Sequence, residues 1–163
     1  MTAFEELYAR HAPAVYRFAL SLSGNRATAE DITSETFVRV WSARDRLELT
    51  SVIGYLITIA RHLHLEQLRR AERHSELAHD PEDAAPGPQE RAAGRSELDA
   101  VLADLQTLAE PDRAALLMRA QDQVSYEEIA AALRITAGAA KVKVHRARRR
   151  LAELRLRREG APV

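Results

Sequence analysis

Cationic side chains crowd the last part of the chain, between residues 134 and 158. This stretch holds ten Lys or Arg side chains and one Glu, whereas residues 75–112 hold two basic and ten acidic side chains. The opposite charges of these segments nearly cancel, and the whole chain has a formal net charge of +0 at pH 7. A chain sorted into an acidic middle and a basic end is typical of a protein that binds a polyanion through one end.

The basic stretch has helical periodicity, and it divides into two faces. The face expected to pack on a core carries Ala140, Val144, Ala147, Leu151 and Leu154. A helix in the DNA major groove needs a basic face opposite, because outward side chains reach base edges while flanking cations meet phosphates. A solvated basic face without a ligand is the alternative. On the first interpretation, DNA is bound by Lys141, Val142, Lys143, His145, Arg146, Arg148 and Arg149.

A second basic patch lies on a predicted helix nearer the N-terminus. Its outward cations are Arg61, Arg69, Arg70 and Arg73, and the planar side chains of Tyr55 and His62 lie close to them. Cations beside planar side chains suit single-stranded nucleic acid, where bases stack and phosphates form ion pairs. An ordinary polar helix face explains the pattern equally well.

Other chemistries find little support in the sequence. The chain has no cysteine, which removes disulfides, thiolate zinc sites and cysteine nucleophiles. His62 and His64 are two positions apart on a helix and point about 200° apart, so they cannot bind one metal ion. Signatures of phosphate loops, nucleophile elbows and paired carboxylates are absent. We therefore expect no enzyme activity, small-molecule substrate, cofactor or metal site.

The composition is that of a soluble globular protein, with 46% hydrophobic and 29% charged residues. No apolar run approaches the roughly 18 residues of a membrane helix. The N-terminal MTAFEELYARH is acidic and amphipathic, whereas a secretory signal is basic and then apolar. A cytoplasmic location is expected.

The periodicity is helical on both sides of residues 75–96, which contain three prolines, two glycines and no aromatic or β-branched residue. This predicts an all-α fold of two small helical domains, 1–74 and 97–158, joined by a flexible acidic linker, with 159–163 as a tail. Pro13 should break or kink the first helix. Helices are expected to begin after the capping residues Thr2, Ser51, Ser96, Ser125 and Thr136.

Residues 125–157 have the pattern of a helix-turn-helix motif. A helix of about two turns over 126–133 precedes a tight turn at 134–135 and a long basic helix. Together with AEDITSETFVRVW (29–41) and YLITIARHLHLEQLRR (55–70), the segment SYEEIAAALRITAGAAKVKVHRARRRL (125–151) resembles an extracytoplasmic-function (ECF) sigma factor of bacterial RNA polymerase. The resemblance covers nearly the whole chain, and it implies a region-two domain, a linker and a region-four domain.

The resemblance implies partners and roles for particular residues. Core RNA polymerase would be bound through its β′ clamp and β flap, and Phe37 and Trp41 would pack in the core rather than contact the clamp. An anti-sigma factor would hold the protein inactive, and the active protein would be associated with the nucleoid. The clamp-binding residues would be Asp31, Glu35, Val38 and Arg39. The residues that read the −10 element and assist melting would be Tyr55, Arg61, His62, Arg69 and Arg70. The basic helix would read the −35 element.

The chain departs from the family pattern at several positions. His62 replaces a common Asn, and Arg134 replaces a usual turn Gly, at some cost if φ is positive there. Ala139, Ala140 and Val142 stand where Thr, Val and Ser are frequent. These changes suggest a divergent promoter preference. The alternatives are a helix-turn-helix regulator that does not engage polymerase and a decoy that binds an anti-sigma factor.

Overall fold

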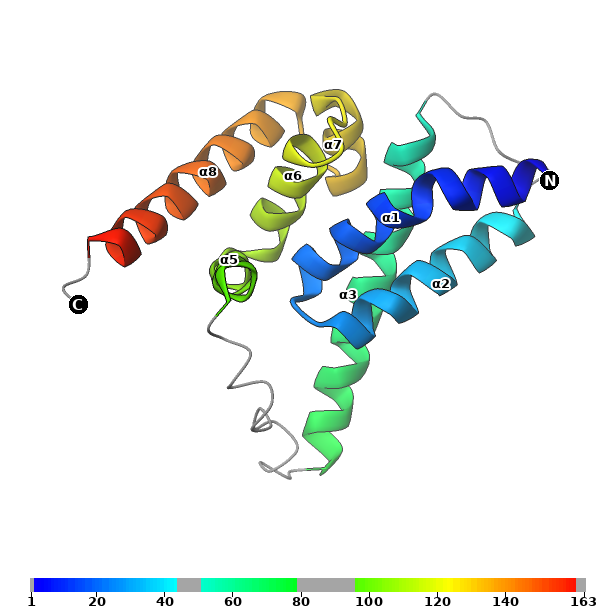
Figure 1. The fold of residues 1–163 in the computed structure, drawn as a ribbon, viewed down its shortest axis with the longest axis horizontal. Helices are drawn as coiled ribbons and strands as arrows, with labels where there is room; N and C mark the ends of the chain where they lie inside the picture. Colours follow the sequence, from blue (N-terminus) through cyan, green and yellow to red (C-terminus); the bar gives the residue numbers. More distant parts are fainter. Residues whose placement is uncertain (1, 44–50, 79–95, 161–163) are drawn as a thin grey trace.

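The computed structural model describes residues 2–43, 51–78 and 96–160, and each regular element in these ranges is an α-helix. The N-terminal bundle consists of α1 (Ala3–Ser23), α2 (Arg26–Ser42) and α3 (Val52–Ala78). The C-terminal group consists of α5 (Glu97–Gln106), α6 (Glu110–Ala120), α7 (Tyr126–Leu133) and α8 (Ala137–Glu159). The all-α prediction is confirmed (Figure 1). Most of the predicted linker, residues 79–95, lies outside the described residues.

Short polar side chains fix where the helices begin. Each predicted cap accepts a hydrogen bond from the backbone N–H three residues further on, and these caps are Thr2, Ser51, Ser96, Ser125 and Thr136. Asn25 caps α2 in the same way, with the Thr28 N–H 2.9 Å from its Oδ1. Such bonds satisfy N–H groups that the first turn of a helix leaves unpaired. Local sequence therefore determines the start of these helices.

Pro13 lies inside α1 and does not end it, so of the predicted break or kink, the break is wrong. A proline in a helix costs roughly 3 kcal/mol, because it removes one backbone hydrogen bond and crowds the preceding turn. The same helix fully buries Val15, Phe18 and Leu22. Each such side chain contributes about 1.5–3 kcal/mol. Packing on α2 and α3 thus outweighs the local penalty.

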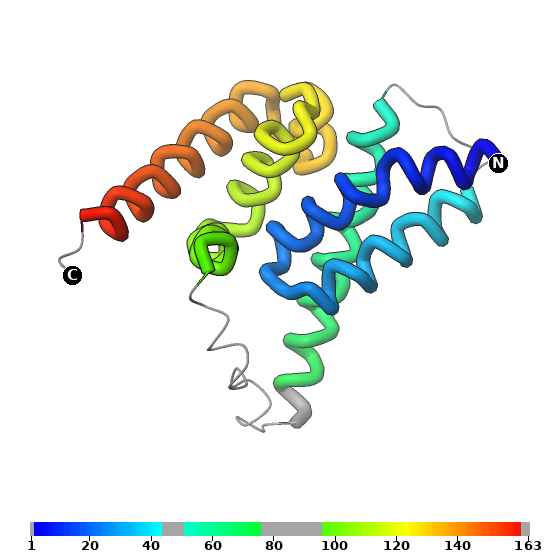
Figure 2. The backbone as a smooth tube through the Cα atoms, viewed as in Figure 1, coloured from blue at the N-terminus to red at the C-terminus, as the bar shows by residue number. Residues whose placement is uncertain are grey.

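The two helical groups pack against each other. In the N-terminal bundle α1, α2 and α3 are mutual neighbours, and in the C-terminal group α6 contacts α7 and α8. Across the boundary, α1 contacts α5 and α6, while α3 contacts α6 and α7. Figures 1 and 2 show α8 extending away from the N-terminal bundle. The basic helix is therefore displayed on the outside of the molecule.

The predicted burial of the two aromatic residues of α2 is half right. Phe37 is buried, whereas Trp41 is 46% exposed. The Trp41 ring packs edge-on against Phe4, with the ring centroids 4.9 Å apart. Its position explains the difference, because Trp41 lies in the last turn of α2, at the end of the bundle.

Candidate nucleic-acid interface

Helix α8 has one buried face and one basic face. Ala140, Val144 and Ala147 are buried, and α8 packs on α6 and α7. Leu151 and Leu154 are only half-buried, because α8 extends beyond its contacts with α6 and α7. Lys143 is also half-buried. The other residues predicted to bind DNA are exposed, and they are Lys141, Val142, His145, Arg146, Arg148 and Arg149.

A tight turn sets the angle between α7 and α8. Arg134 ends α7 in the left-handed conformation, with φ 59° and ψ 48°. The Ile135 N–H then donates to the Ala130 carbonyl at 3.0 Å, which closes the end of the helix. The condition under which Arg134 was expected to cost stability is therefore met, because φ is positive at this residue. The turn and its two helices form the predicted helix-turn-helix arrangement.

One carboxylate holds two cations of α8. Asp112, in the first turn of α6, lies 3.4 Å from Lys143 Nζ and accepts hydrogen bonds from Arg146 Nε and Nη2, each at 3.1 Å. Burial alone would raise the pKa of Asp112, but the hydrogen bonds from Arg146 and Lys143 outweigh it and hold this pKa below its usual value. Asp112 was not among the residues predicted from the sequence. Its only signal was an acidic residue directly after Pro111 at a helix start.

The aromatic ring of Tyr126 contacts two cations, Arg119 of α6 and Lys141 of α8. The Arg119 guanidinium carbon is 4.5 Å from the centroid of the Tyr126 ring, and Lys141 Nζ is 5.6 Å from it. Cations at such distances from an aromatic face are attracted by its quadrupole. The ammonium group of Lys141 is therefore attracted toward the Tyr126 ring of α7.

The second basic patch is split by the fold. Tyr55, His62, Arg69 and Arg70 are exposed on α3. The projection that put Arg61 on the outward face as well is wrong, because α6 covers it. A projection of one helix cannot reveal a surface that another domain buries. The exposed residues remain candidates for contact with single-stranded DNA.

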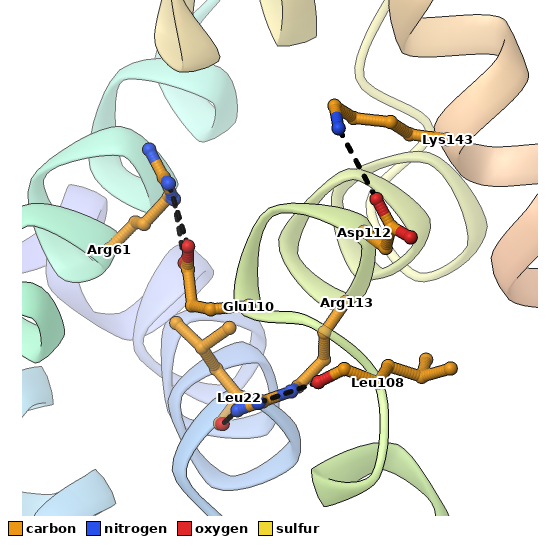
Figure 3. A network of polar contacts seen from close by, with 7 residues as sticks. All are labelled: Leu22, Arg61, Leu108, Glu110, Asp112, Arg113 and Lys143. Atoms are coloured by element: carbon orange, nitrogen blue, oxygen red, sulfur yellow. Dashed lines mark hydrogen bonds and ion pairs between the residues drawn. The ribbon is translucent and has the colours of Figure 1, made fainter.

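Arg61 forms an ion pair that joins the two helical groups (Figure 3). Its Nε and Nη2 each donate to a carboxylate oxygen of Glu110 at 2.8 Å, and the two side chains are 11% and 15% exposed. His64 is buried beside this pair, and neither ring nitrogen has a hydrogen-bond partner among the described residues. Burial lowers the pKa of His64, and Glu110 opposes that effect. The neutral imidazole is therefore the form that suits this interface.

The surface predicted to bind polymerase lies along a groove between α2 and α3. Its exposed members are Asp31, Glu35 and Val38. Arg39 is half-buried, with Nη2 3.1 Å from an oxygen of Glu66 and Nε 3.7 Å from one of Glu35. Glu66, which links the two helices through Arg39, was not among the residues predicted from the sequence. The groove therefore presents two carboxylates and Val38 outward, and it also contains two cations, Arg39 and Arg70. Both cations lie near the same Glu66 oxygen, with Arg70 Nη2 4.0 Å from it.

The described residues contain neither a membrane-spanning helix nor a cluster of metal ligands. None of these helices is long and apolar enough to cross a membrane. No group of three or more His, Asp or Glu side chains in the described ranges is placed to hold a metal ion.

Comparisons with known proteins identify both helical groups. A Sigma-70 region 2 model matches residues 7–74, and a Sigma-70 region 4 model matches residues 98–151. The chain is 38% identical over 159 residues to the RNA polymerase sigma factor CarQ of Myxococcus xanthus, covering 93% of this chain and 88% of CarQ. It is 36% identical over 156 residues to the ECF RNA polymerase sigma factor SigE of Mycolicibacterium smegmatis, covering 93% of this chain but only 61% of that longer relative.

The fold also matches a solved sigma factor. The structure is similar to RpoE of Bartonella quintana, crystallised with the anti-sigma factor NepR, at a TM-score of 0.79 and 28% identity. The match covers 94% of this chain and 97% of RpoE, so it includes both helical groups. The two matched regions, the helix-turn-helix motif and these relatives lead to one conclusion. The chain belongs to the ECF RNA polymerase sigma factors, which are not enzymes but initiate transcription by recognising promoters with RNA polymerase.

Proposed function

We propose that this sigma factor uses three separate surfaces, one for core RNA polymerase and two for promoter DNA. Residues 1–74 would act as the region-two unit, and residues 97–158 as the region-four unit. Residues 75–96 would be the linker between them, and residues 159–163 a tail. This division agrees with the two matched ranges, 7–74 and 98–151.

The exposed basic face of α8 would read the −35 element. The observation that carries this proposal is the placement of six predicted DNA-binding residues on one exposed helix face, opposite the buried Ala140, Val144 and Ala147. Flanking cations such as Lys141 and Arg148 would meet phosphates, and residues on the central ridge, including Arg146 and Arg149, would meet base edges. Binding should weaken steeply with added salt, since phosphate contacts release counterions.

The groove between α2 and α3 would bind the β′ clamp of the polymerase. Asp31 and Glu35 would pair with basic residues of the clamp, and Val38, which is 56% exposed, would supply apolar contact. The two carboxylates beside this apolar side chain give the surface a charge that complements a basic partner. The β flap would be contacted by the region-four unit.

The exposed face of α3 would bind the −10 element in its unpaired form. Tyr55 and His62 would lie against an unstacked base, and Arg69 and Arg70 against phosphates. Binding only the unpaired form shifts the closed-to-open equilibrium, so melting needs no hydrolysis by this subunit. Arg61 would join this surface only when its pair with Glu110 opens.

An anti-sigma factor would regulate the protein in the cytoplasm. The similarity to NepR-bound RpoE extends over both helical groups, which supports an arrangement able to accept such a partner. The active protein would be associated with the nucleoid through the polymerase.

The test is co-purification with bacterial core RNA polymerase, followed by run-off transcription from a pool of promoter fragments. Wild-type protein should bind core and give selective transcripts. Val38→Asp should reduce co-purification at least severalfold, because it replaces the apolar contact with a charge that must be desolvated in the interface. Arg149→Ala should leave co-purification unchanged and lower promoter-dependent transcription several-fold.

Arg157→Ala is the matched control, because this exposed arginine lies on α8 but beyond the region-four match. It should affect neither measurement. Failure of the wild-type protein to bind core would favour a free-standing DNA-binding regulator. Core binding without transcripts would favour a decoy.

A further inference from the structure

Asp112 contacts the DNA-facing helix although it belongs to another element. Its carboxylate is 14% exposed and receives Nε and Nη2 of Arg146, whose side chain is 60% exposed. Lys143 Nζ lies 3.4 Å from Oδ1. Figure 3 shows the Lys143 side chain pointing toward Asp112. Asp112, at the start of α6, therefore contacts Lys143 and Arg146, which lie on adjacent turns of α8.

The geometry of this contact decides which edge of Arg146 stays available. A guanidinium carries five N–H groups, and a carboxylate that binds Nε and Nη2 occupies one side of the fork. Among the described residues, Nη1 of Arg146 has no hydrogen-bond partner. The end-on edge, made of Nη1 and the second N–H of Nη2, is thus free. Two parallel N–H groups on one edge are what a bidentate contact to guanine O6 and N7 requires.

Asp112 also restrains a side chain that would otherwise move freely. An exposed arginine samples many rotamers, and it loses that freedom when it binds a base. Here the Arg146 side chain loses its rotamer freedom when the protein folds instead of when it binds DNA. This favours a contact that depends on the orientation of the guanidinium. A phosphate contact can also be bidentate, but it carries no sequence information, so only a contact to a base edge turns the fixed orientation into sequence preference.

The same carboxylate weakens general attraction to DNA. It places one negative charge among cations that would otherwise all face phosphates. Arg148 and Arg149 of α8 have no ion-pair partner among the described residues, so both remain available for DNA, and Arg148 on the flank of the helix for the phosphates. Asp112 therefore acts in opposite directions on sequence-specific and sequence-independent binding.

We propose that Asp112 is a positioning residue that fixes Arg146 for bidentate contact with a guanine of the −35 element. It raises promoter discrimination while lowering affinity for unrelated DNA. This inference rests on the proposed role of α8.

The experiment measures binding of the holoenzyme, formed with core polymerase, to two duplexes by competition. One is a promoter selected in the run-off assay, and the other carries substitutions at each guanine of its −35 element. Asp112→Ala should lower the preference for the promoter about tenfold, because the bidentate contact loses its fixed orientation. Its affinity for the substituted duplex should stay the same or rise.

Two further variants make the test specific. Arg146→Ala should lose the same preference, and adding Asp112→Ala to it should cause no further loss. Asp104→Ala is the matched control, because Asp104 of α5 pairs with Arg158 on the part of α8 beyond the region-four match. This control should leave the preference unchanged. If the alanine variant folds poorly, Asp112→Asn can replace it, because asparagine keeps the shape of the side chain. Asp112→Asn should give an intermediate loss of preference.

The outcomes separate this inference from the function on which it rests. If Asp112→Ala strengthens binding to both duplexes equally, the carboxylate only screens charge and the inference is wrong. A loss of thermal stability with unchanged preference would assign Asp112 a packing role and also overturn it. If Arg149→Ala and Arg146→Ala both leave promoter binding intact, the proposed role of α8 itself fails.

Discussion

Asp122 lies in the turn between α6 and α7, with Oδ2 buried and without a hydrogen-bond partner among the described residues. Burial raises the pKa of this carboxyl to about 6, and the positive charge of Arg17 opposes the rise. The folded protein therefore binds this proton more tightly than the unfolded chain does. Stability falls as the pH rises from about 4 to about 6, and the loss persists above that range.

Asp122→Asn should remove this penalty. At pH 7.5 the variant should be more stable by on the order of 1 kcal/mol, a value reduced for the partial exposure of the carboxyl. The gain should shrink at pH 4.5, where the wild-type carboxyl is largely protonated. Urea unfolding at the two pH values measures the difference. Asp31→Asn, on an exposed part of α2, controls for loss of one negative charge. Equal stability of wild type and Asp122→Asn at pH 7.5 would refute the argument.

In the turn between α7 and α8, the backbone conformation of one residue lowers the free energy of unfolding. Arg134 has a Cβ atom in a left-handed conformation that glycine adopts freely. Arg134→Gly should therefore stabilise the protein by roughly 0.5–1 kcal/mol, after the extra entropy of unfolded glycine is included. Arg134→Ala keeps the strain and removes only the guanidinium, so it should bring no such gain. Thermal unfolding of the two variants compares them directly, and an alanine variant as stable as the glycine variant would contradict this explanation.

Helix starts were predictable because capping is local. The five predicted caps make their hydrogen bonds within three residues, so neighbouring sequence contains the necessary information. The helix-turn-helix pattern was predictable for the same reason. Pro13 was not, because the packing that holds α1 together comes from helices elsewhere in the chain. The fold class and the element boundaries thus follow from local rules, with tertiary packing as the exception.

The partners of the site residues depend on longer distances. Arg61 pairs with Glu110, 49 residues away, and Arg113 donates to the carbonyl of Leu22, 91 residues away. No local pattern contains such pairings. Helix projection identified the basic faces of α3 and α8, but it could not show that Arg61 is covered or that Asp112 neutralises part of α8. The candidate surfaces were therefore predictable, and the state of their individual cations was not.

At the scale of the whole molecule, the C-terminal group caps the end of α1. Gln106 Nε2 donates to the Ser21 carbonyl at 3.1 Å, and Gln121 Nε2 donates to Ser21 Oγ at 3.0 Å. The buried guanidinium of Arg113 donates to the Leu22 carbonyl and, at 3.1 Å, to that of Leu108. A cation suits this position, because the last carbonyls of a helix carry partial negative charge. Region-four residues thus complete a region-two helix.

The Arg61–Glu110 pair should control how firmly the two regions pack. Removing Glu110 leaves the Arg61 charge buried without its carboxylate, which costs roughly 3 kcal/mol when the surroundings cannot relax. Here relaxation is available, because separating the regions returns Arg61 to water. Glu110→Ala should therefore shift the free protein toward separated regions rather than unfold either one. The same change would expose Arg61 for contact with DNA.

Energy transfer between two dyes measures this shift in the free chain. The protein has no cysteine, so Ser34→Cys on α2 and Ala152→Cys on α8 provide unique attachment sites. Transfer should fall in Glu110→Ala and remain unchanged in Glu97→Ala, which removes an exposed acid of α5. Adding Arg61→Ala to Glu110→Ala should restore part of the transfer, because the unpaired charge is then gone. Unchanged transfer in Glu110→Ala, with helical content preserved, would mean that the carbonyl contacts of Gln106 and Arg113 hold the regions together without the ion pair.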